Sequence, residues 1–441
     1  MSQPQPAHSP LLALPDPCLL AVMGCCAAID QRSLFSAARA HSRLHQAATL
    51  VLRSIKADVR HDRQLVDIML YLAQQGCHIR RLRLFGRDHL QLALHQLPPS
   101  LQLHALKLEG FHLQLQPGNG WQGVLGAKVA AAAAGAPPLT QLWLNECTLL
   151  DGMDGLAAAL LQLPALQHLS LRSLVDGTRD DVACITTGVL QQLPHLSYLD
   201  IEGADVQGPD TDSPALQPLQ ALTKLAHLRL LDLCPADLVV TASMLSGMHD
   251  LTHLVINNAA FQPGALAGKP KLQHLVLDSC TVRGAAGVAA VLAQLQPLQQ
   301  LAHLDLGNSL GADTPDLQHQ GFFAGTGADS GDVRGGWPPA AAYSALTANS
   351  KLQHLNISQA MLPAGVWQHL FPADRQLPHL RYLNIAYVEE PSGMECPAPE
   401  GKLLARCCPG LQHLVVLGLQ CTEEQLRELR AVAADIFWAP G

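Results

Sequence analysis

One short phrase recurs along this chain and constrains its fold more than any other feature. The tetrapeptide LQHL begins at Leu166, Leu272, Leu352 and Leu411, and variants such as LAHL, LTHL and LRYL begin at other points. The second residue after nearly every copy is Leu or Ile, so the pattern is L-x-x-L-x-L. Twelve such phrases begin between Ile79 and Leu411, and nine of the eleven intervals are 21 to 31 residues long. A chain of this kind grows in one dimension by stacking similar units, so its 441 residues need no single large core.

The spacing of the apolar residues predicts a strand in each phrase. Side chains alternate between the two faces of a strand, so the fourth and sixth positions point one way and the third, fifth and seventh point the other. Apolar residues at helical spacing lie between the phrases, for example at 156–163, 182–189 and 288–295. A strand, a helix and a parallel strand connect by a right-handed crossover. Repeating the unit predicts an α/β solenoid, with parallel strands on a concave inner side and helices outside.

The phrases resemble the leucine-rich repeat, whose period is about 20–29 residues. Cys147 and Cys280 occupy its Asn/Cys position, and Leu, Ala, Ser or Val stands there in other repeats. This is similar to the ribonuclease-inhibitor-like and cysteine-containing classes, and the resemblance implies a horseshoe. We expect the solenoid over residues 58–421, with a Gly-, Asp- and Pro-rich loop insert at about 311–339. Thr422 and Gln425 predict a capping box that begins a C-terminal capping helix within 422–441.

The N-terminal residues lack the repeat. Residues 1–10 are predicted to be a disordered tail, and residues 11–57 a small all-α module with helices at 16–24, 30–39 and 42 to about 57. The segment Leu14-Pro15-Asp16, the apolar pair Leu19-Leu20 and the later Leu34 resemble the F-box. The resemblance implies docking to the adaptor of an SCF-type ubiquitin ligase through Leu14, Pro15, Leu19 and Leu34. The alternative is a helical cap that only shields the core of the first repeat.

Composition and motifs disfavour several function classes. The net charge of −8 disfavours nucleic acid as a partner. The sequence contains no run of about 18 apolar residues, so no membrane span is expected. The sequence contains no GxSxG, GxxxxGK[ST], HExxH or CxxC. We therefore expect that the protein is not an enzyme and that it has no catalytic residue, cofactor or metal. We also expect it to be monomeric outside its complex. The 12 scattered cysteines are expected to be small buried hydrophobes in a cytoplasmic protein, with the nucleus, the cytoskeleton or the ciliary axoneme as alternatives.

A column of histidines is the most unusual feature of the predicted concave face. They occupy the third position of the phrase, and Tyr198 and Tyr382 occupy the same position in two other repeats. Neighbouring strands lie about 4.8 Å apart, so these rings are expected to stack. Three interpretations stay open: residues tolerated in a duplicated consensus, a partner-binding strip, or a metal or pH-responsive site. The column histidines are His168, His227, His253, His274, His303, His354 and His413.

The fifth and seventh positions complete the concave face. Early repeats place basic residues there, middle repeats mixed and acidic ones, and late repeats neutral polar ones. Trp143 is the best single anchor, because aromatic residues dominate interface hot spots, although packing against a neighbouring repeat is the alternative. The predicted partner-binding residues are Trp143, His168, Arg172, Tyr198, Asp200, Glu202, His227, Arg229, His253, Asn257, His274, Asp278, His303, Asp305, His354 and Tyr382.

These features predict a protein-interaction module without catalysis of its own. The resemblances imply an F-box and leucine-rich-repeat substrate receptor of an SCF-type ubiquitin ligase, with the protein target on the concave face and the adaptor on residues 11–57. One alternative is a leucine-rich-repeat scaffold without a ubiquitin role, attached to cytoskeletal or axonemal assemblies. Another is an enzyme inhibitor.

Overall fold

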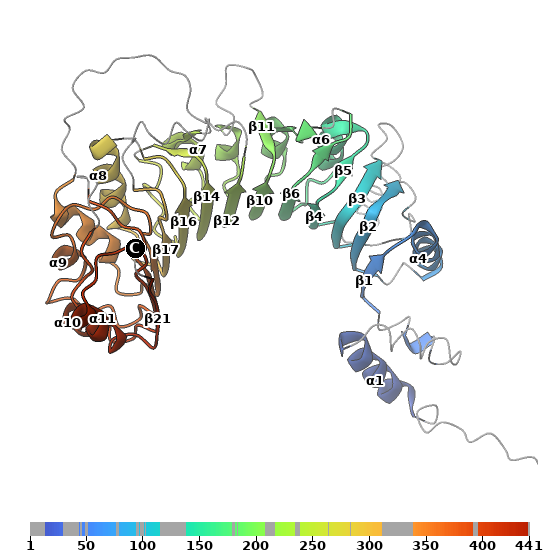
Figure 1. The fold of residues 1–441 in the computed structure, drawn as a ribbon. Helices are drawn as coiled ribbons and strands as arrows, with labels where there is room; N and C mark the ends of the chain where they lie inside the picture. Colours follow the sequence, from blue (N-terminus) through green and yellow to red (C-terminus); the bar gives the residue numbers. More distant parts are fainter. Residues whose placement is uncertain are drawn as a thin grey trace, which may run out of the picture. The chain divides into compact units, whose positions relative to one another are not determined.

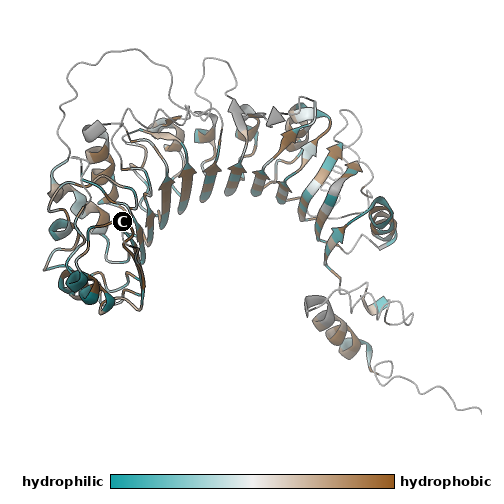
Figure 2. Ribbon diagram, in the orientation of Figure 1, coloured by the Kyte–Doolittle hydropathy of each residue, from teal (hydrophilic) through white to brown (hydrophobic). Residues whose placement is uncertain are grey.

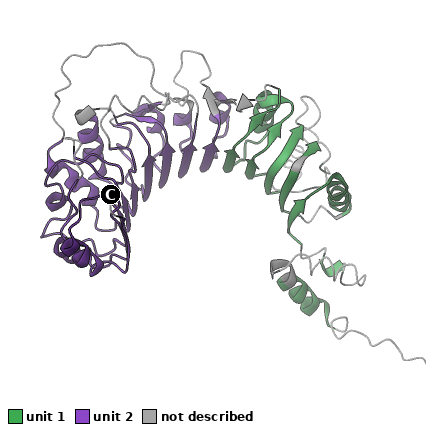
Figure 3. Cartoon of the chain, in the orientation of Figure 1, with its two compact units in different colours: residues 1–183 green, residues 184–441 purple. Residues whose placement is uncertain are grey.

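A computed structural model gives the arrangement of the chain (Figure 1). It forms two compact units, Met1–Ala183 and Cys184–Gly441 (Figure 3), and each is described by itself. The structure describes residues 14–29, 44, 46–48, 52–75, 79–93, 97, 101, 103–114, 138–178, 181–182, 184–207, 217–233, 239–262, 264–282, 284–310, 338–390 and 396–439.

In the described part of unit 1, five longer parallel strands pair in chain order. They are β1 (Ser54–Val59), β2 (Arg81–Ala93), β3 (Ala105–Gln114), β4 (Gln141–Asn145) and β6 (His168–Arg172). Short strands β5 (Thr148–Leu149) and β7 (Val175–Asp176) extend the pairing beyond each turn, and β8 (Asp181–Val182) pairs antiparallel with β7. The helices described in this unit are α1 (Asp16–Ile29), α4 (Asp62–Gln75) and α6 (Gly152–Leu161).

In the described part of unit 2, the phrases and the C-terminal segment form nine parallel strands that also pair in chain order. They are β10 (Tyr198–Glu202), β12 (His227–Leu231), β14 (His253–Asn257), β16 (His274–Asp278), β17 (His303–Asp305), β18 (His354–Asn356), β19 (Tyr382–Asn384), β20 (His413–Val415) and β21 (Asp435–Phe437). In this unit the strands line one side and the helical segments the other (Figure 1). The chain is therefore an α/β leucine-rich-repeat solenoid, as the phrase predicts.

The outer layer of unit 2 mixes α-helices with 3-10 helices and short strands. The α-helices are α7 (Ala242–Leu245), α8 (Gly284–Leu295), α9 (Trp367–Leu370), α10 (Gly401–Cys407) and α11 (Glu423–Arg430). The 3-10 helices are η5 (Thr187–Gln192), η6 (Gln217–Ala221) and η8 (Ala340–Thr347). Two pairs of short parallel strands complete the layer, β9 (Cys184–Thr186) with β11 (Asp205–Gln207) and β13 (Val239–Val240) with β15 (Ala260–Phe261).

The core lies between the strands and this outer layer. In β14 the side chains of Leu254 and Ile256 have no exposed surface, whereas His253, Val255 and Asn257 between them are half-buried. The same alternation recurs in β12 and β16. Burying one such aliphatic side chain contributes about 1.5–3 kcal/mol, so every repeat adds its own layer of stabilisation.

The eighth position of the phrase has left-handed backbone in eleven of the twelve repeats. All eight non-glycine residues that the structure describes with left-handed backbone occupy it, with φ between 48° and 56°. Gly110, Gly203 and Gly418 occupy it with φ of 73°, 61° and 68°. A left-handed residue reverses the chain direction, which turns it from the strand toward the outer layer. The eight are Glu146, Ser173, Asp232, Asn258, Ser279, Asn308, Gln359 and Tyr387.

Two predictions about the ends of the array are wrong. Residues 54–57 form strand β1 instead of the end of a helix, and Ser54 pairs with Arg81 in parallel register. The sheet therefore begins inside the segment assigned to the N-terminal module. At the C-terminus, α11 begins with the expected capping box of Thr422 and Gln425, and it is largely hydrophilic (Figure 2). It ends at Arg430, and β21 then adds a strand where only the capping helix was expected.

The outer helices match the prediction in part. Helices α6 and α8 lie where the apolar spacing predicts them. The helix predicted at 182–189 is wrong, because this segment forms β8, β9 and the start of η5. Its β-branched residues Val182, Ile185, Thr186 and Thr187 favour extended backbone. Residues 111–114 continue β3, and most of the longer helix and loop predicted at 111–138 lies outside the described residues, as does most of the insert at 311–339. No described helix is both long and apolar enough to cross a membrane.

Candidate binding surface on the strands

The rings predicted to form a column stack directly on one another in unit 2. Parallel register places His227 opposite His253, His253 opposite His274, and so on through His303 and His354 to Tyr382. Successive ring centroids are 4.1, 5.4, 4.0, 3.9 and 4.2 Å apart, and the angles between their planes are 22° or less. We call these six residues the ring ladder. The predicted stacking is confirmed for them.

The two ends of the column behave differently. Tyr198 lies 5.6 Å from His227 with its ring tilted by 33°, so it adjoins the ladder without stacking face to face. His413 stands opposite Tyr382 in the register, but its Nδ1 lies 3.1 Å from Oδ2 of Asp435 on β21. Its exposed imidazole thus faces a carboxylate of the last strand.

Burial keeps the ladder histidines uncharged. Desolvation is the main cause that lowers the pKa of all five ladder histidines. Repulsion between neighbouring imidazolium groups also lowers the pKa of His253, His274, His303 and His354, and the carboxylate of Asp305 partly opposes this in the last three. Together these effects lower the pKa of His274 and His303 to about 4. At neutral pH the ladder is therefore a row of neutral rings that are half-buried along one side.

Charged residues at the fifth and seventh positions lie beside the ladder, toward the C-terminal ends of the strands. Near its start, Nη1 of Arg229 donates to Oδ1 of Asp200 at 3.1 Å and to Oε2 of Glu202 at 2.9 Å. Near its middle, Asp278 and Asp305 lie close together, and burial followed by the charge of Asp305 raises the pKa of Asp278. The predicted acidic character of the middle repeats is thus concentrated around these two carboxylates.

The remaining predicted residues of unit 2 also lie on this face. Asn257 is half-buried at the end of β14, and its Oδ1 is shielded from solvent without a hydrogen bond. Nδ1 of His274 is in the same state. Both atoms are inaccessible at the surface, so other atoms of these half-buried side chains provide the area that a partner can contact.

Unit 1 brings its own two predicted aromatic residues together. The rings of Trp143 and His168 are 4.5 Å apart and tilted by 49°. Trp143 occupies the fifth position of its phrase, on β4, opposite Lys107 on β3 and Ser170 on β6. Its side chain is half-buried, as is that of Arg172. Trp143 thus contacts a neighbouring repeat, and its role as an anchor for a partner stays a prediction.

The predicted docking residues of the N-terminal module differ in exposure. Pro15 is exposed and Leu14 is half-buried immediately before α1, whereas Leu19 on α1 is buried, with 1% of its surface exposed. Leu34 lies outside the described residues. The roles of these four residues stay predictions.

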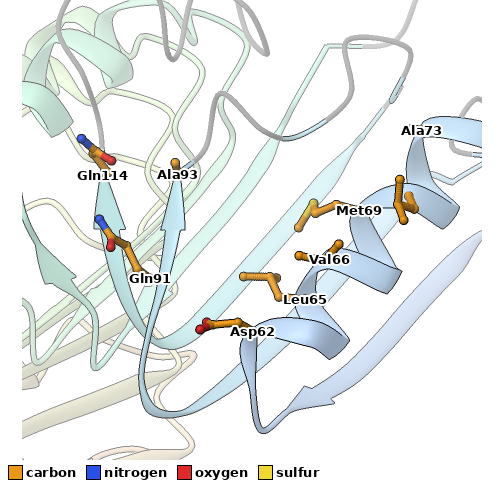
Figure 4. Close-up of a pocket in the computed structure, with 9 residues that line it drawn as sticks. Asp62, Leu65, Val66, Met69, Ala73, Gln91, Ala93 and Gln114 are labelled. Carbon is orange, nitrogen blue, oxygen red and sulfur yellow. The ribbon is translucent and has the colours of Figure 1, made fainter.

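Sequence reasoning missed two features of potential binding interest. A cleft of about 670 Å³ lies between α4 and the ends of β2 and β3 in unit 1, lined partly by the exposed apolar side chains of Val66 and Leu70 (Figure 4). In unit 2, His303, Asp305 and His354 form a cluster whose donor atoms lie within 4.8 Å of one another. The sequence identifies His303 and His354 through the histidine column and Asp305 through the charged fifth positions. It does not indicate that the three side chains lie close together.

Comparisons with known proteins add similarity of fold only. No protein-family model matches the chain, and no curated protein sequence is similar to it. An internalin from Listeria monocytogenes is 13% identical over 90% of this chain and 89% of its own, with a TM-score of 0.46. A leucine-rich-repeat protein of Leptospira interrogans is 13% identical over 87% and 81%, with a TM-score of 0.44. A chain in the octameric complex of Latrophilin 3, Unc5D and FLRT2 is 14% identical over 82% and 84%, with a TM-score of 0.40. The repeat register and burial of the chain itself establish its solenoid, and its subclass within the leucine-rich repeats stays a prediction.

Proposed function

We propose that this protein is a non-catalytic interaction protein that binds a partner protein along the ring ladder of unit 2. The ladder itself is the observation that carries this proposal. Its six rings form a continuous row of flat, uncharged surfaces that are only half-buried. Because each ring is held on a strand and between its neighbours, binding costs little additional side-chain entropy.

The groups beside the ladder supply specificity. Arg229 and Glu202, whose side chains are each 29% exposed, form the accessible part of the ion pair described above. Interfaces combine a flat apolar centre with such polar groups at the rim. A partner that covers the rings and also contacts Arg229 or Glu202 gains both contributions.

The test is capture of partners by the purified full chain, followed by affinity measurement with each partner found. The variant His253→Ala, His274→Ala, His303→Ala removes three consecutive rings and is expected to weaken binding at least about tenfold, as for truncation of a hot spot. The matched control is Asp250→Ala, Lys271→Ala, which removes an exposed ion pair of 2.6 Å in the turns before two of these strands. Unchanged binding by the triple variant, with a native circular dichroism spectrum, contradicts the proposal.

For the N-terminal module we propose docking to the adaptor of an SCF-type ubiquitin ligase, which makes the protein a substrate receptor. The support is the F-box resemblance, together with the accessibility of Leu14 and Pro15 at the start of α1. The full chain is expected to bind purified adaptor, and Leu14→Ala, Pro15→Ala to abolish binding, whereas Cys25→Ala on the exposed surface of α1 leaves it unchanged. If the wild-type chain does not bind the adaptor, the substrate-receptor role is wrong and a scaffold without a ubiquitin role is the proposal that stands.

We also propose a cytoplasmic location. The support is chemical: all eight cysteines whose side chains the structure describes are free thiols. Reduced cysteines are typical of a reducing compartment. Localisation of a tagged full chain by microscopy tests this, and accumulation outside the cell would contradict it.

A further inference from the structure

We propose that His303, Asp305 and His354 form a binding site for one divalent transition-metal ion, with zinc as the representative. Two imidazoles and one carboxylate are a donor set that zinc uses in proteins, and three protein ligands leave a coordination position open. Among the residues that the structure describes, this is the one group of three or more His, Cys, Asp or Glu side chains close enough to share an ion. The proposed metal site does not depend on the binding of a partner protein.

The strand register brings the three ligands together. His303 on β17 stands opposite His354 on β18, and their ring centroids are 3.9 Å apart. Asp305 lies two residues after His303, so its side chain points to the same face of the sheet. The donor atoms of all three lie within 4.8 Å of one another. Donor atoms around a tetrahedral zinc ion are about 3.3 Å apart, so metal binding requires the half-buried rings to tilt out of their near-parallel stack.

Two hydrogen bonds orient the carboxylate of Asp305. Oδ1 of Asp305 accepts a hydrogen bond from Nδ2 of Asn356 at 2.8 Å and from the backbone N–H of Gly307 at 3.0 Å. Both bonds end on Oδ1, and neither uses Oδ2. Ligating carboxylates in metal sites are commonly held in this manner by an outer shell of hydrogen bonds.

The surrounding charge favours a cation. Asp278 and Asp305 form no ion pair with any lysine or arginine that the structure describes. The two carboxylates approach each other beside Gly307. A Cβ atom placed on Gly307 would lie 3.3 Å from Oδ1 of Asp305 and 3.4 Å from Oδ1 of Asp278. Nδ2 of Asn356 would be 3.1 Å from the same point. Two close carboxylates without a cationic partner repel each other, and a bound divalent ion offsets this repulsion.

Other steps of the ladder lack this combination. His227 and His253 have Arg229 and Val255 at the fifth positions of their phrases, and His253 and His274 have Val255 and Val276. The cation of Arg229 and the apolar valines cannot ligate a metal. His274 also stands opposite His303, on whose strand Asp305 lies, but among the described residues the one group with donor atoms within 4.8 Å of one another is His303, Asp305 and His354.

The test is zinc titration of the full chain, reduced and freed of metal with a chelator, by isothermal calorimetry without any partner. We expect one ion bound per chain at about micromolar affinity or tighter, and Asp305→Asn and His354→Gln to weaken it at least about 100-fold. The matched control is His413→Gln, a column histidine that has the single carboxylate partner Asp435. It is expected to bind zinc as the wild type does, and circular dichroism verifies that each variant is folded.

Three outcomes would overturn the site. The first is that the wild type binds no stoichiometric zinc. The second is that Asp305→Asn and His354→Gln bind zinc with the affinity of the wild type. The third is that His413→Gln loses as much affinity as these two variants do. Cobalt provides a separate reading of the ligands, since the Co²⁺-loaded wild type is expected to show visible absorption without a thiolate charge-transfer band. Such a band would place the ion on cysteines and also contradict the proposal.

Discussion

Asp200 and Arg229 stand opposite each other on β10 and β12, where Nη1 of Arg229 donates a 3.1 Å hydrogen bond to Oδ1 of the fully buried Asp200 carboxylate. A buried carboxylate deprived of its cation is strongly destabilising, since its desolvation is no longer offset. The Arg229 side chain is 29% exposed, which reduces the effect.

We therefore expect Arg229→Met to lower the free energy of unfolding by about 2–3 kcal/mol. Glu202→Gln serves as the control, because Glu202 is part-exposed and its loss is expected to cost less than about 1 kcal/mol. Urea unfolding followed by circular dichroism gives both values. Equal effects of the two substitutions would show that burial of Asp200 is not decisive.

Acid is expected to destabilise unit 2 through the ring ladder. The pKa of His274 and His303 is about 4 in the folded chain, compared with an ordinary value of 6.5. Between these values the unfolded chain binds more protons, so the free energy of unfolding falls as the pH drops from 6.5 toward 4 and does not depend on these groups above 6.5. Because the rings are half-exposed, we expect a total loss of about 1–2 kcal/mol.

Urea unfolding at pH 7.5, 5.5 and 4.5 measures this loss. His274→Gln removes one of the two groups and is expected to lose less stability between pH 6.5 and 4 than the wild type. If the two proteins show parallel pH profiles, the lowered pKa of His274 does not contribute.

The buried cysteines are expected to be chemically inert. Desolvation raises the pKa of Cys147 to about 11 and that of Cys280 to about 12, whereas Cys18 and Cys25 are exposed. Thiolates are the reactive species, so alkylation of the native protein by iodoacetamide at pH 7.5 is expected to be at least about 100-fold slower at Cys147 and Cys280. Peptide mass spectrometry over time measures the rates. Labelling of Cys280 as fast as Cys18 would mean that this repeat opens readily.

Gln359 is expected to be a site where glycine stabilises the protein. It is exposed and has a φ of 56°, a left-handed conformation that costs a non-glycine residue about 1 kcal/mol. Gln359→Gly should raise the free energy of unfolding by up to about 1 kcal/mol. Gln353→Gly is the matched control, because Gln353 is exposed, lies outside the left-handed region and should lose about 0.5–1 kcal/mol. Thermal unfolding of the two variants should shift in opposite directions, and a shift in the same direction would contradict the backbone explanation.

The sequence alone determined the strands of most repeats and the face to which each of their side chains points. The alternation of buried and half-buried residues in β14 follows from local geometry, because a strand turns each successive side chain to the opposite face. Helix α8 and the Thr422 cap were predictable for the same reason, since helical spacing and capping involve residues within a few positions of one another.

Tertiary structure decided the features that depend on distant neighbours. Strand β1 and the residues before it have the weak apolar pattern Leu52, Ile55 and Ala57, and pairing with β2 satisfies backbone groups that a local pattern cannot reveal. The order of the repeats predicts that His303 and His354 adjoin, but only the tertiary structure brings donor atoms of Asp305 and both histidines within 4.8 Å of one another. Repeat spacing specifies which way a side chain points and which strand lies next to its own, whereas the packing of the side chains decides which polar atoms lie close enough to act together.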